Sequence, residues 1–223
     1  MNPNLTEIVF ILDCSGSMAG LEADTIGGFN AMIAKQQKEP GEALISTVLF
    51  NHMSTVVSDR APVQRVVPLD GRTYRVGGST ALYDAVGSAI RHIRTVHRYA
   101  RKEDVPARTL FVITTDGMEN ASHHYSGKEV RAMIQAQQEQ YHWEFLFLGA
   151  NINAEAAADS IGIHADHAVN YCCDKAGTAL NFEAISDAVR AVRSSQTLDA
   201  GWKAPIVADY KRRSKHGGRS AQQ

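Results

Sequence analysis

The stretch EIVFILDCSGSMAG, residues 7–20, combines the two features that decide the fold. Its first half is an almost uninterrupted run of branched apolar residues, which is too short for a helix and typical of a strand covered on both faces. The run ends in Asp13, and Ser15 and Ser17 follow at alternate positions. The sequence therefore predicts a central, buried strand that leads into a loop with three oxygen-bearing side chains.

The composition indicates one globular domain without a strong charge. The chain has 223 residues, of which 44% are hydrophobic, enough to bury one sizeable core. Its 23 basic and 24 acidic residues leave a formal net charge of −1. We therefore expect no general attraction for nucleic acid or for an anionic membrane surface.

Cysteine usage and hydropathy indicate the compartment. The three cysteines, Cys14, Cys172 and Cys173, are an odd number, and two of them are neighbours, which is a poor arrangement for structural disulfides. The chain shows no signal segment, and no apolar run approaches the roughly 20 residues that a membrane-spanning helix needs. We therefore predict a cytoplasmic protein with reduced thiols and no membrane contact.

Strand and helix patterns alternate along the chain outward from residues 7–13. Apolar runs predict further strands, and three- and four-residue apolar spacings predict helices between them. The expected strands are residues 43–50, 54–59, 107–116, 143–150 and 167–171, and the expected helices are residues 21–38, 80–99, 126–140, a piece ending near 161, and 178–194. The link between 43–50 and 54–59 is too short for a crossover helix, so these strands should form an antiparallel hairpin at one edge. The predicted fold class is α/β: a doubly wound, mostly parallel, Rossmann-like sheet with one antiparallel edge strand and helices on both faces.

The carboxyl-terminal part of the chain has a different character. We assign residues 1–196 to the domain and residues 197–223 to a basic extension that is flexible at its end, because no clear apolar period continues there. The segment YKRRSKHGGR, residues 210–219, collects five basic residues and two glycines with almost nothing apolar. It predicts a solvated, disordered tail, and a contact with nucleic acid or an acidic partner is the alternative.

Polar side chains follow two of the predicted strands at one edge of the sheet. Asp13 and Asp116 each end a buried strand, and ligands bind at the carboxyl ends of the strands in such sheets. The hydroxyls that can join them belong to Ser15, Ser17 and Thr80 or its neighbour Ser79. Two carboxylates and three hydroxyls form a set of hard oxygen ligands, which suits Mg²⁺, Mn²⁺ or Ca²⁺.

Three segments resemble one known family in the same order along the chain. DCSGS, residues 13–17, matches the D-x-S-x-S motif of von Willebrand factor A (vWA) domains, which is part of their metal-ion-dependent adhesion site (MIDAS). GGSTALYDAV, residues 77–86, resembles the segment that supplies a threonine, and ITTDGMEN, residues 113–120, resembles the strand that ends in T-D-G. The resemblance covers about residues 5–195 and is closest to bacterial intracellular members.

The resemblance implies a role for each matching residue. Ser15, Ser17 and Thr80 would offer hydroxyls to a divalent ion, and Asp13 and Asp116 would contact it directly or through water. One coordination position would remain for an aspartate or glutamate of a partner protein. We therefore expect a metal-dependent protein-binding module, not an enzyme, that uses Mg²⁺ in the first place and Mn²⁺ or Ca²⁺ as alternatives.

Two other interpretations of these residues remain open at this stage. Asp and Ser residues also cap helices and form turns, so DCSGS, Thr80 and Asp116 can each be structural. Alternatively, Asp13 is the nucleophile of a Mg²⁺-dependent phosphohydrolase, since such enzymes of the haloacid dehalogenase type keep an aspartate at the end of the first strand. Those enzymes have a second aspartate two residues later, whereas this chain has Ser15.

Residues next to the motifs carry weaker expectations. Asp84 either holds a water or serine of the site or lies on a solvated helix face, and Glu119 and Asn120 either rim the site or face solvent. The adjacent histidines at 123 and 124 lack a third spaced ligand, so we expect no zinc site there. Cys14 should face the core, and the cysteines at 172 and 173 should be partly buried thiols.

Overall fold

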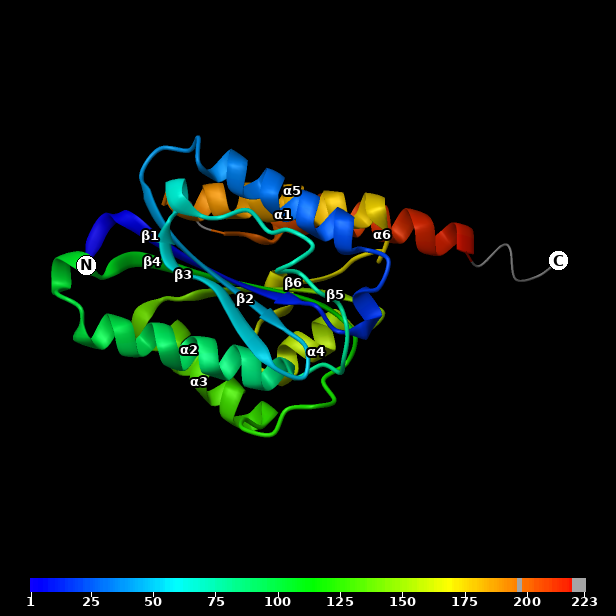
Figure 1. The fold of residues 1–223 in the computed structure, drawn as a ribbon, viewed down its shortest axis with the longest axis horizontal. Coiled ribbons are helices and arrows are strands. Elements are labelled where there is room, and N and C mark those ends of the chain that lie inside the picture. The colour runs from blue at the N-terminus through cyan, green and yellow to red at the C-terminus, as the bar shows by residue number, and fades with distance from the viewer. Residues whose placement is uncertain (196–197, 218–223) are drawn as a thin grey trace.

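A six-stranded sheet forms the centre of the molecule (Figure 1). The computed structural model describes residues 1–195 and 198–217. The strands lie in the order β3-β2-β1-β4-β5-β6. Their bounds are β1 Asn2–Asp13, β2 Glu42–Phe50, β3 Ser54–Pro62, β4 Pro106–Asp116, β5 Glu144–Ala150 and β6 Ala168–Asn170. All neighbours pair in parallel except β2 and β3, which form the predicted antiparallel hairpin at one edge.

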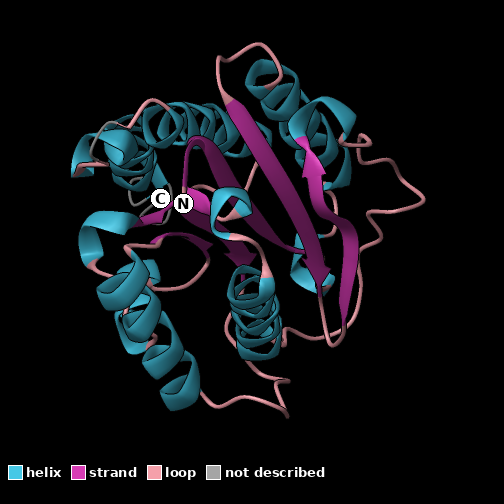
Figure 2. Ribbon diagram, turned by 90° about the vertical axis from the view of Figure 1, so that its left-hand side faces the viewer, coloured by secondary structure: helices cyan, strands magenta, loops and turns pink. Residues whose placement is uncertain are grey.

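Helices cover both faces of this sheet, as Figures 1 and 2 show. One face packs against α1 (Glu22–Gln36), α5 (Lys175–Arg193) and α6 (Ala204–Gly217). The other face packs against α2 (Leu82–Tyr99), α3 (Gly127–Tyr141) and α4 (Ala154–Ser160). The predicted fold class, a doubly wound and mostly parallel α/β sheet, is confirmed.

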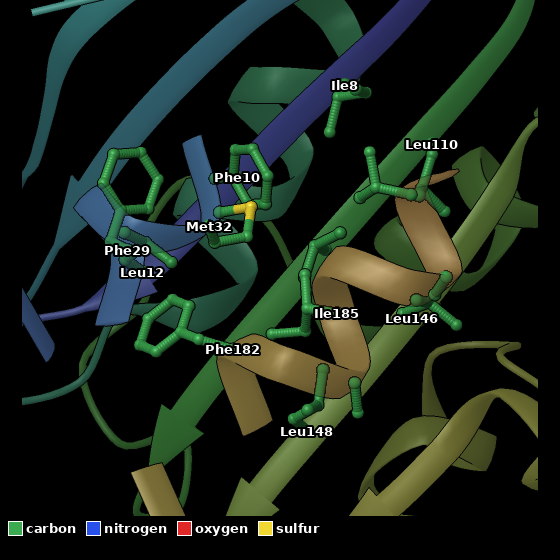
Figure 3. Close-up of a cluster of buried hydrophobic side chains, with 14 of the residues drawn as sticks. Ile8, Phe10, Leu12, Phe29, Met32, Leu110, Leu146, Leu148, Phe182 and Ile185 are labelled. Carbon is green, nitrogen blue, oxygen red and sulfur yellow. The ribbon is translucent and has the colours of Figure 1, made fainter. Parts of the chain in front are cut away.

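Alternation along β1 explains why its sequence is apolar at nearly every position. Phe10 and Leu12 point into the core shared with α1 and α5, where Phe29 and Phe182 meet them (Figure 3). Ile11, between them in sequence, belongs to the core on the opposite face. A strand buried on both sides has no polar face, so the continuous apolar run in residues 7–13 indicates that β1 is central in the sheet.

β1 begins earlier than predicted. Asn2 pairs with Pro106 of β4, and Leu5 pairs with Glu42 of β2. The first residues of the strand gave no apolar pattern, because Asn2 is half-buried and Pro3 and Asn4 are exposed. Hydrogen bonding to two neighbouring strands extends it nonetheless.

The carboxyl-terminal segment folds onto the domain. A short 3₁₀ helix, η5 (Ala200–Lys203), leads into α6, and Trp202 and Ile206 join the core beneath α5. Arg213 of α6 forms ion pairs with Asp209 and Asp174. The prediction of disorder was therefore wrong for residues 210–217, which two apolar anchors and these ion pairs hold in a helix. The predicted flexible end at residues 218–223 lies outside the described residues.

Within residues 1–195 and 198–217, none of the helices combines the length and the apolar character that crossing a membrane requires.

Candidate metal site

Three loops meet at the carboxyl edge of the sheet and bring the predicted residues together. Asp13 ends β1 and Asp116 ends β4, and these two strands are parallel neighbours. Both carboxylates are only 1% exposed. Ser15 and Thr80 are buried as well, whereas Ser17 is exposed at the surface of the site.

Short distances join the side chains across the loops. The backbone N–H of Asp116 donates to Oδ2 of Asp13 over 3.2 Å, and the hydroxyl oxygens of Ser15 and Ser17 are 3.0 Å apart. A methyl group placed on Gly117 would lie 3.4 Å from the Ser17 Oγ and 3.9 Å from the Thr80 Oγ1. The hydroxyls from two different loops thus face the residue that follows Asp116, and glycine leaves the space between them open.

Backbone hydrogen bonds fix the first two loops against each other. The N–H of Gly16 donates to the carbonyl of Gly78, and the N–H of Gly77 donates to the carbonyl of Cys14, each over 2.9 Å. Gly78 has a φ of +78°, in the left-handed region that favours glycine. The relative positions of the serine hydroxyls and Thr80 are therefore built into the main chain.

A third loop holds Thr80 from the other side. The N–H of Thr80 donates to Oδ1 of Asn120 over 2.9 Å, and the N–H of Asn120 donates to the carbonyl of Thr80 over 3.0 Å. Asn120, which we expected at the rim or in solvent, positions a candidate ligand instead. Glu119 has a comparable role, since it accepts N–H bonds from Tyr83, Ala121 and Ser122.

The capping interpretation does not account for these residues. The helix α2 has Ala81 at its N-cap position, and no side chain caps it there. The hydroxyl of Thr80 forms no hydrogen bond with the part of the chain that the structure describes. Ser15 precedes a short 3₁₀ helix without a side-chain capping bond. The hydroxyls of Ser15 and Thr80 therefore cap no helix.

Asp13 is held firmly by three donors. Its Oδ1 accepts the N–H of Ser15 over 2.6 Å, and its Oδ2 accepts the hydroxyl of Thr115 over 2.8 Å as well as the N–H of Asp116. The bond to Ser15 is the turn-forming contact that aspartate favours two residues before an N–H. The carboxylate is thus oriented before any ligand arrives.

Asp116 has two contacts that the sequence did not reveal. Asn151 donates its side-chain amide to Oδ1, and the thiol of Cys173 donates to Oδ2 over 2.7 Å. Burial and this bond to Asp116 together raise the pKa of the Cys173 thiol. Only their positions could have indicated these contacts, because Asn151 follows β5 and Cys173 follows β6 at the same edge of the sheet.

The charge of the site is not balanced by side chains. No lysine, arginine or histidine among the described residues forms an ion pair with Asp13 or Asp116. Buried charges normally have a partner, because burial without one is costly. Two carboxylates beside three hydroxyl oxygens fit a hard divalent cation, so the donor set suits the predicted group. Within the same residues, no group of three or more His, Cys, Asp or Glu side chains could hold a metal, so a cation at this site would depend on the serine and threonine hydroxyls.

The site opens to the surface through a hollow of about 500 Å³. Ser17 and Asp116 line it, together with Asn151, Cys173 and Lys175. An incoming side chain would therefore reach Ser17 and Asp116 from solvent.

Two neighbouring residues have structural roles. Asp84 accepts the backbone N–H groups of residues 123, 124 and 125, each over 2.8 Å, so it anchors a loop and is not on a free helix face. Burial by itself would raise the pKa of Asp84, but these N–H donors outweigh it and lower the pKa. Cys14 faces the core as expected, and burial raises its pKa to about 11.

Tyr74 holds the backbone of Asp13 in place, and no sequence pattern indicated this role. Its side chain is 1% exposed, and its hydroxyl donates to the backbone carbonyl of Asp13 over 2.5 Å. Burial raises the pKa of this hydroxyl, so it stays protonated and remains a donor. The residue lies in a polar loop 61 positions away from Asp13, where no periodic pattern marks it.

Substitution of Tyr74 by phenylalanine is expected to lower the free energy of unfolding by about 1–2 kcal/mol, because a buried carbonyl loses its donor. Urea unfolding of the metal-free protein measures this. Tyr99→Phe is the matched control, since Tyr99 is 78% exposed and should change stability by less than about 0.5 kcal/mol. Equal stability of the two variants would show that the Tyr74 hydroxyl does not hold the end of β1.

Comparison with known proteins identifies the type of fold. No family model matches the sequence, and no curated protein matches it. A von Willebrand factor type A protein from Catenulispora acidiphila is 16% identical, with a TM-score of 0.53 over 85% of this chain and 43% of that one. The ArnB paralog VWA2 from Sulfolobus acidocaldarius is 15% identical, with a TM-score of 0.53 over 83% of this chain and 45% of that one.

A third similar structure is proximal thread matrix protein 1 from the mussel byssus, described with a zinc-occupied MIDAS motif. It is 14% identical, with a TM-score of 0.54 over 83% of this chain and 46% of that one. This chain thus spans less than half the length of each of these structures. Together they show that it has the vWA fold.

Proposed function

We propose that the chain is a metal-ion-dependent protein-binding module that docks an acidic side chain of a partner protein through a divalent cation. The observation that carries this proposal is the pair of carboxylates, Asp13 and Asp116, each 1% exposed, without a cationic partner among the described residues. The residues that would hold the cation are Asp13, Ser15, Ser17, Thr80 and Asp116.

The donor set favours Mg²⁺, with Mn²⁺ and Ca²⁺ as alternatives, because every ligand is a hard oxygen. When bound, the cation supplies the attraction for an incoming carboxylate, since three of its five protein ligands are neutral hydroxyls. The protein contributes orientation: Asp13 is held by three donors, and Asn151 and Cys173 hold Asp116.

The structure of the mussel byssus protein supports a divalent ion at this position, because that vWA-like fold holds zinc at its MIDAS motif. Lys175 supports an acidic partner. It lines the hollow and forms no ion pair with the described residues, so its charge is available to an anionic side chain. The three free cysteines suit a reducing compartment, and we include a cytoplasmic location in the proposal.

We also propose that the site binds and does not catalyse. The Asp13 carboxylate accepts hydrogen bonds from three donors, and a carboxylate engaged in this way is a weak nucleophile. Ser15 stands where a phosphohydrolase of the type considered would need its second aspartate. The hydroxyl of Ser15 pairs with that of Ser17 and not with a base.

Selection from a displayed library of random peptides tests the docking step. We expect the peptides enriched on the immobilised protein in Mg²⁺ to share an aspartate or glutamate and to dissociate in EDTA. The same peptides should fail to bind a Thr80→Val protein, in which one candidate ligand is replaced by an isosteric methyl group. Enriched peptides that lack a shared acidic residue, or that bind equally well in EDTA, would contradict the proposal.

A further inference from the structure

A second cavity lies at the opposite end of β4 from the metal site. It has a volume of about 460 Å³, within the range of small-molecule sites, and it lies between the carboxyl-terminal turns of α2 and α3. The lining residues that matter here are Arg94, His97 and Arg98 of α2, Thr109 of β4, Gln137 of α3, and Trp143. β4 therefore runs from this cavity at its beginning to Asp116 at its end.

Two polar side chains of this cavity lack hydrogen-bond partners within the described residues. Gln137 is 2% exposed, and its Oε1 atom is buried without a hydrogen bond. Trp143 is 5% exposed, and its indole N–H forms no hydrogen bond within the residues that the structure describes. An unpaired buried polar group costs about 1–3 kcal/mol, so native proteins rarely keep one such as the Gln137 oxygen without a use for it.

The aromatic wall of the cavity is rigid. Trp143 stacks on Phe111 with ring centroids 5.4 Å apart, and His97 meets Trp143 edge-on at the same separation. His97 is fixed in turn by the carboxylate of Glu7, which lies 2.6 Å from its Nε2. Glu7 is completely buried and also pairs with Arg60. The wall is thus ready to receive a flat ring.

The mouth of the cavity is positively charged. Arg94 and Arg98 are both exposed and project from successive turns of α2. Arg94 forms no ion pair in the described part of the chain. Among the described lining residues, none is an aspartate or glutamate. A ligand that enters here meets two guanidinium groups first, which favour a carboxylate.

We infer that this cavity binds a small aromatic carboxylate with a polar substituent on its ring. The ring lies against Trp143 and His97, the carboxylate pairs with Arg94 and Arg98, and the ring substituent bonds to the amide of Gln137. This combination gives a partner to both arginines and to the Gln137 amide. The site is independent of the cation, because it is at the other end of the sheet.

Isothermal titration with 4-hydroxybenzoate and with indole-3-carboxylate tests this inference, and ligand-observed NMR confirms contact with the ring protons. We expect saturable binding of at least one acid. The matched neutral compound, 4-hydroxybenzamide, should bind about tenfold more weakly than 4-hydroxybenzoate, because it lacks the charge that the arginines recognise. Cyclohexanecarboxylate should also bind more weakly, because it lacks the flat ring.

Variants separate this site from non-specific attraction. The double variant Arg94→Gln/Arg98→Gln and the single variant Gln137→Leu should each weaken binding about tenfold. Arg91→Gln is the matched control, since Arg91 is an exposed arginine of α2 outside the cavity and should leave affinity unchanged. EDTA should also leave it unchanged. The inference is overturned if neither acid binds saturably, or if the double variant binds as well as the Arg91→Gln protein.

Discussion

Replacement of Asp13 by alanine is expected to abolish saturable Mg²⁺ binding and to lower the free energy of unfolding by about 2–4 kcal/mol. Metal binding is lost because one of only two carboxylates in the candidate ligand set disappears. Stability is lost because Ser15, Thr115 and Asp116 each lose the acceptor of a hydrogen bond. Titration with Mg²⁺ measures the first effect, and urea unfolding in EDTA measures the second.

The control for Asp13→Ala is Asp24→Ala. Asp24 lines the same hollow but is not in the candidate ligand set, so its removal should leave Mg²⁺ affinity nearly unchanged. This pair separates a ligand from a nearby charge that merely attracts cations. Wild-type affinity in a folded Asp13→Ala protein would show that Asp13 is structural and would remove it from the site.

Replacement of Glu7 by alanine is expected to give the second large effect, a loss of about 3–5 kcal/mol in the free energy of unfolding. Glu7 is fully buried in β1, with Arg60 Nε 2.7 Å and His97 Nε2 2.6 Å from its carboxylate oxygens. Without it, the guanidinium of Arg60 remains in place with no counterion, and its Nη2 is already buried without a hydrogen bond. Urea unfolding at neutral pH measures the loss.

A double variant distinguishes the lost pair from lost packing. Glu7→Leu/Arg60→Met removes both charges and fills the space with apolar atoms, and it should recover most of the stability that Glu7→Ala loses. Glu103→Ala is the surface control, because the side chain of Glu103 is 71% exposed. A loss below about 1 kcal/mol for Glu7→Ala would show that the Arg60 guanidinium does not depend on Glu7 as its counterion.

The sheet could be predicted, and the candidate ligands could be selected, because their signals are local. The apolar run of residues 7–13 reports a strand covered on both faces, and Asp13 and Asp116 mark where two such strands end. The parallel pairing of β1 with β4 then places both carboxylates at one edge. The run and the two strand ends can be read from the sequence, whereas the pairing of β1 with β4 comes from the structure.

The supporting residues could not be predicted because their contacts depend on the order of strands in space. Tyr74 reaches Asp13 from a loop, and Cys173 reaches Asp116 from beyond β6. No spacing rule connects positions that far apart. The helix α6 was missed for another reason: it is mostly polar, and Ile206 with the neighbouring Trp202 supplies too few apolar residues to form a helical period.

The most direct measurement is isothermal titration of the EDTA-treated protein with Mg²⁺, Mn²⁺ and Ca²⁺, beside the Thr80→Val variant. Thr80 suits this test because its hydroxyl bonds to no described residue, so valine should leave the stability of the metal-free protein unchanged. We predict one saturable site in the wild-type protein that is weakened at least about tenfold in the variant. Absence of saturable binding by the wild-type protein, or equal affinity of both proteins, would contradict the assignment of this edge of the sheet as a metal site.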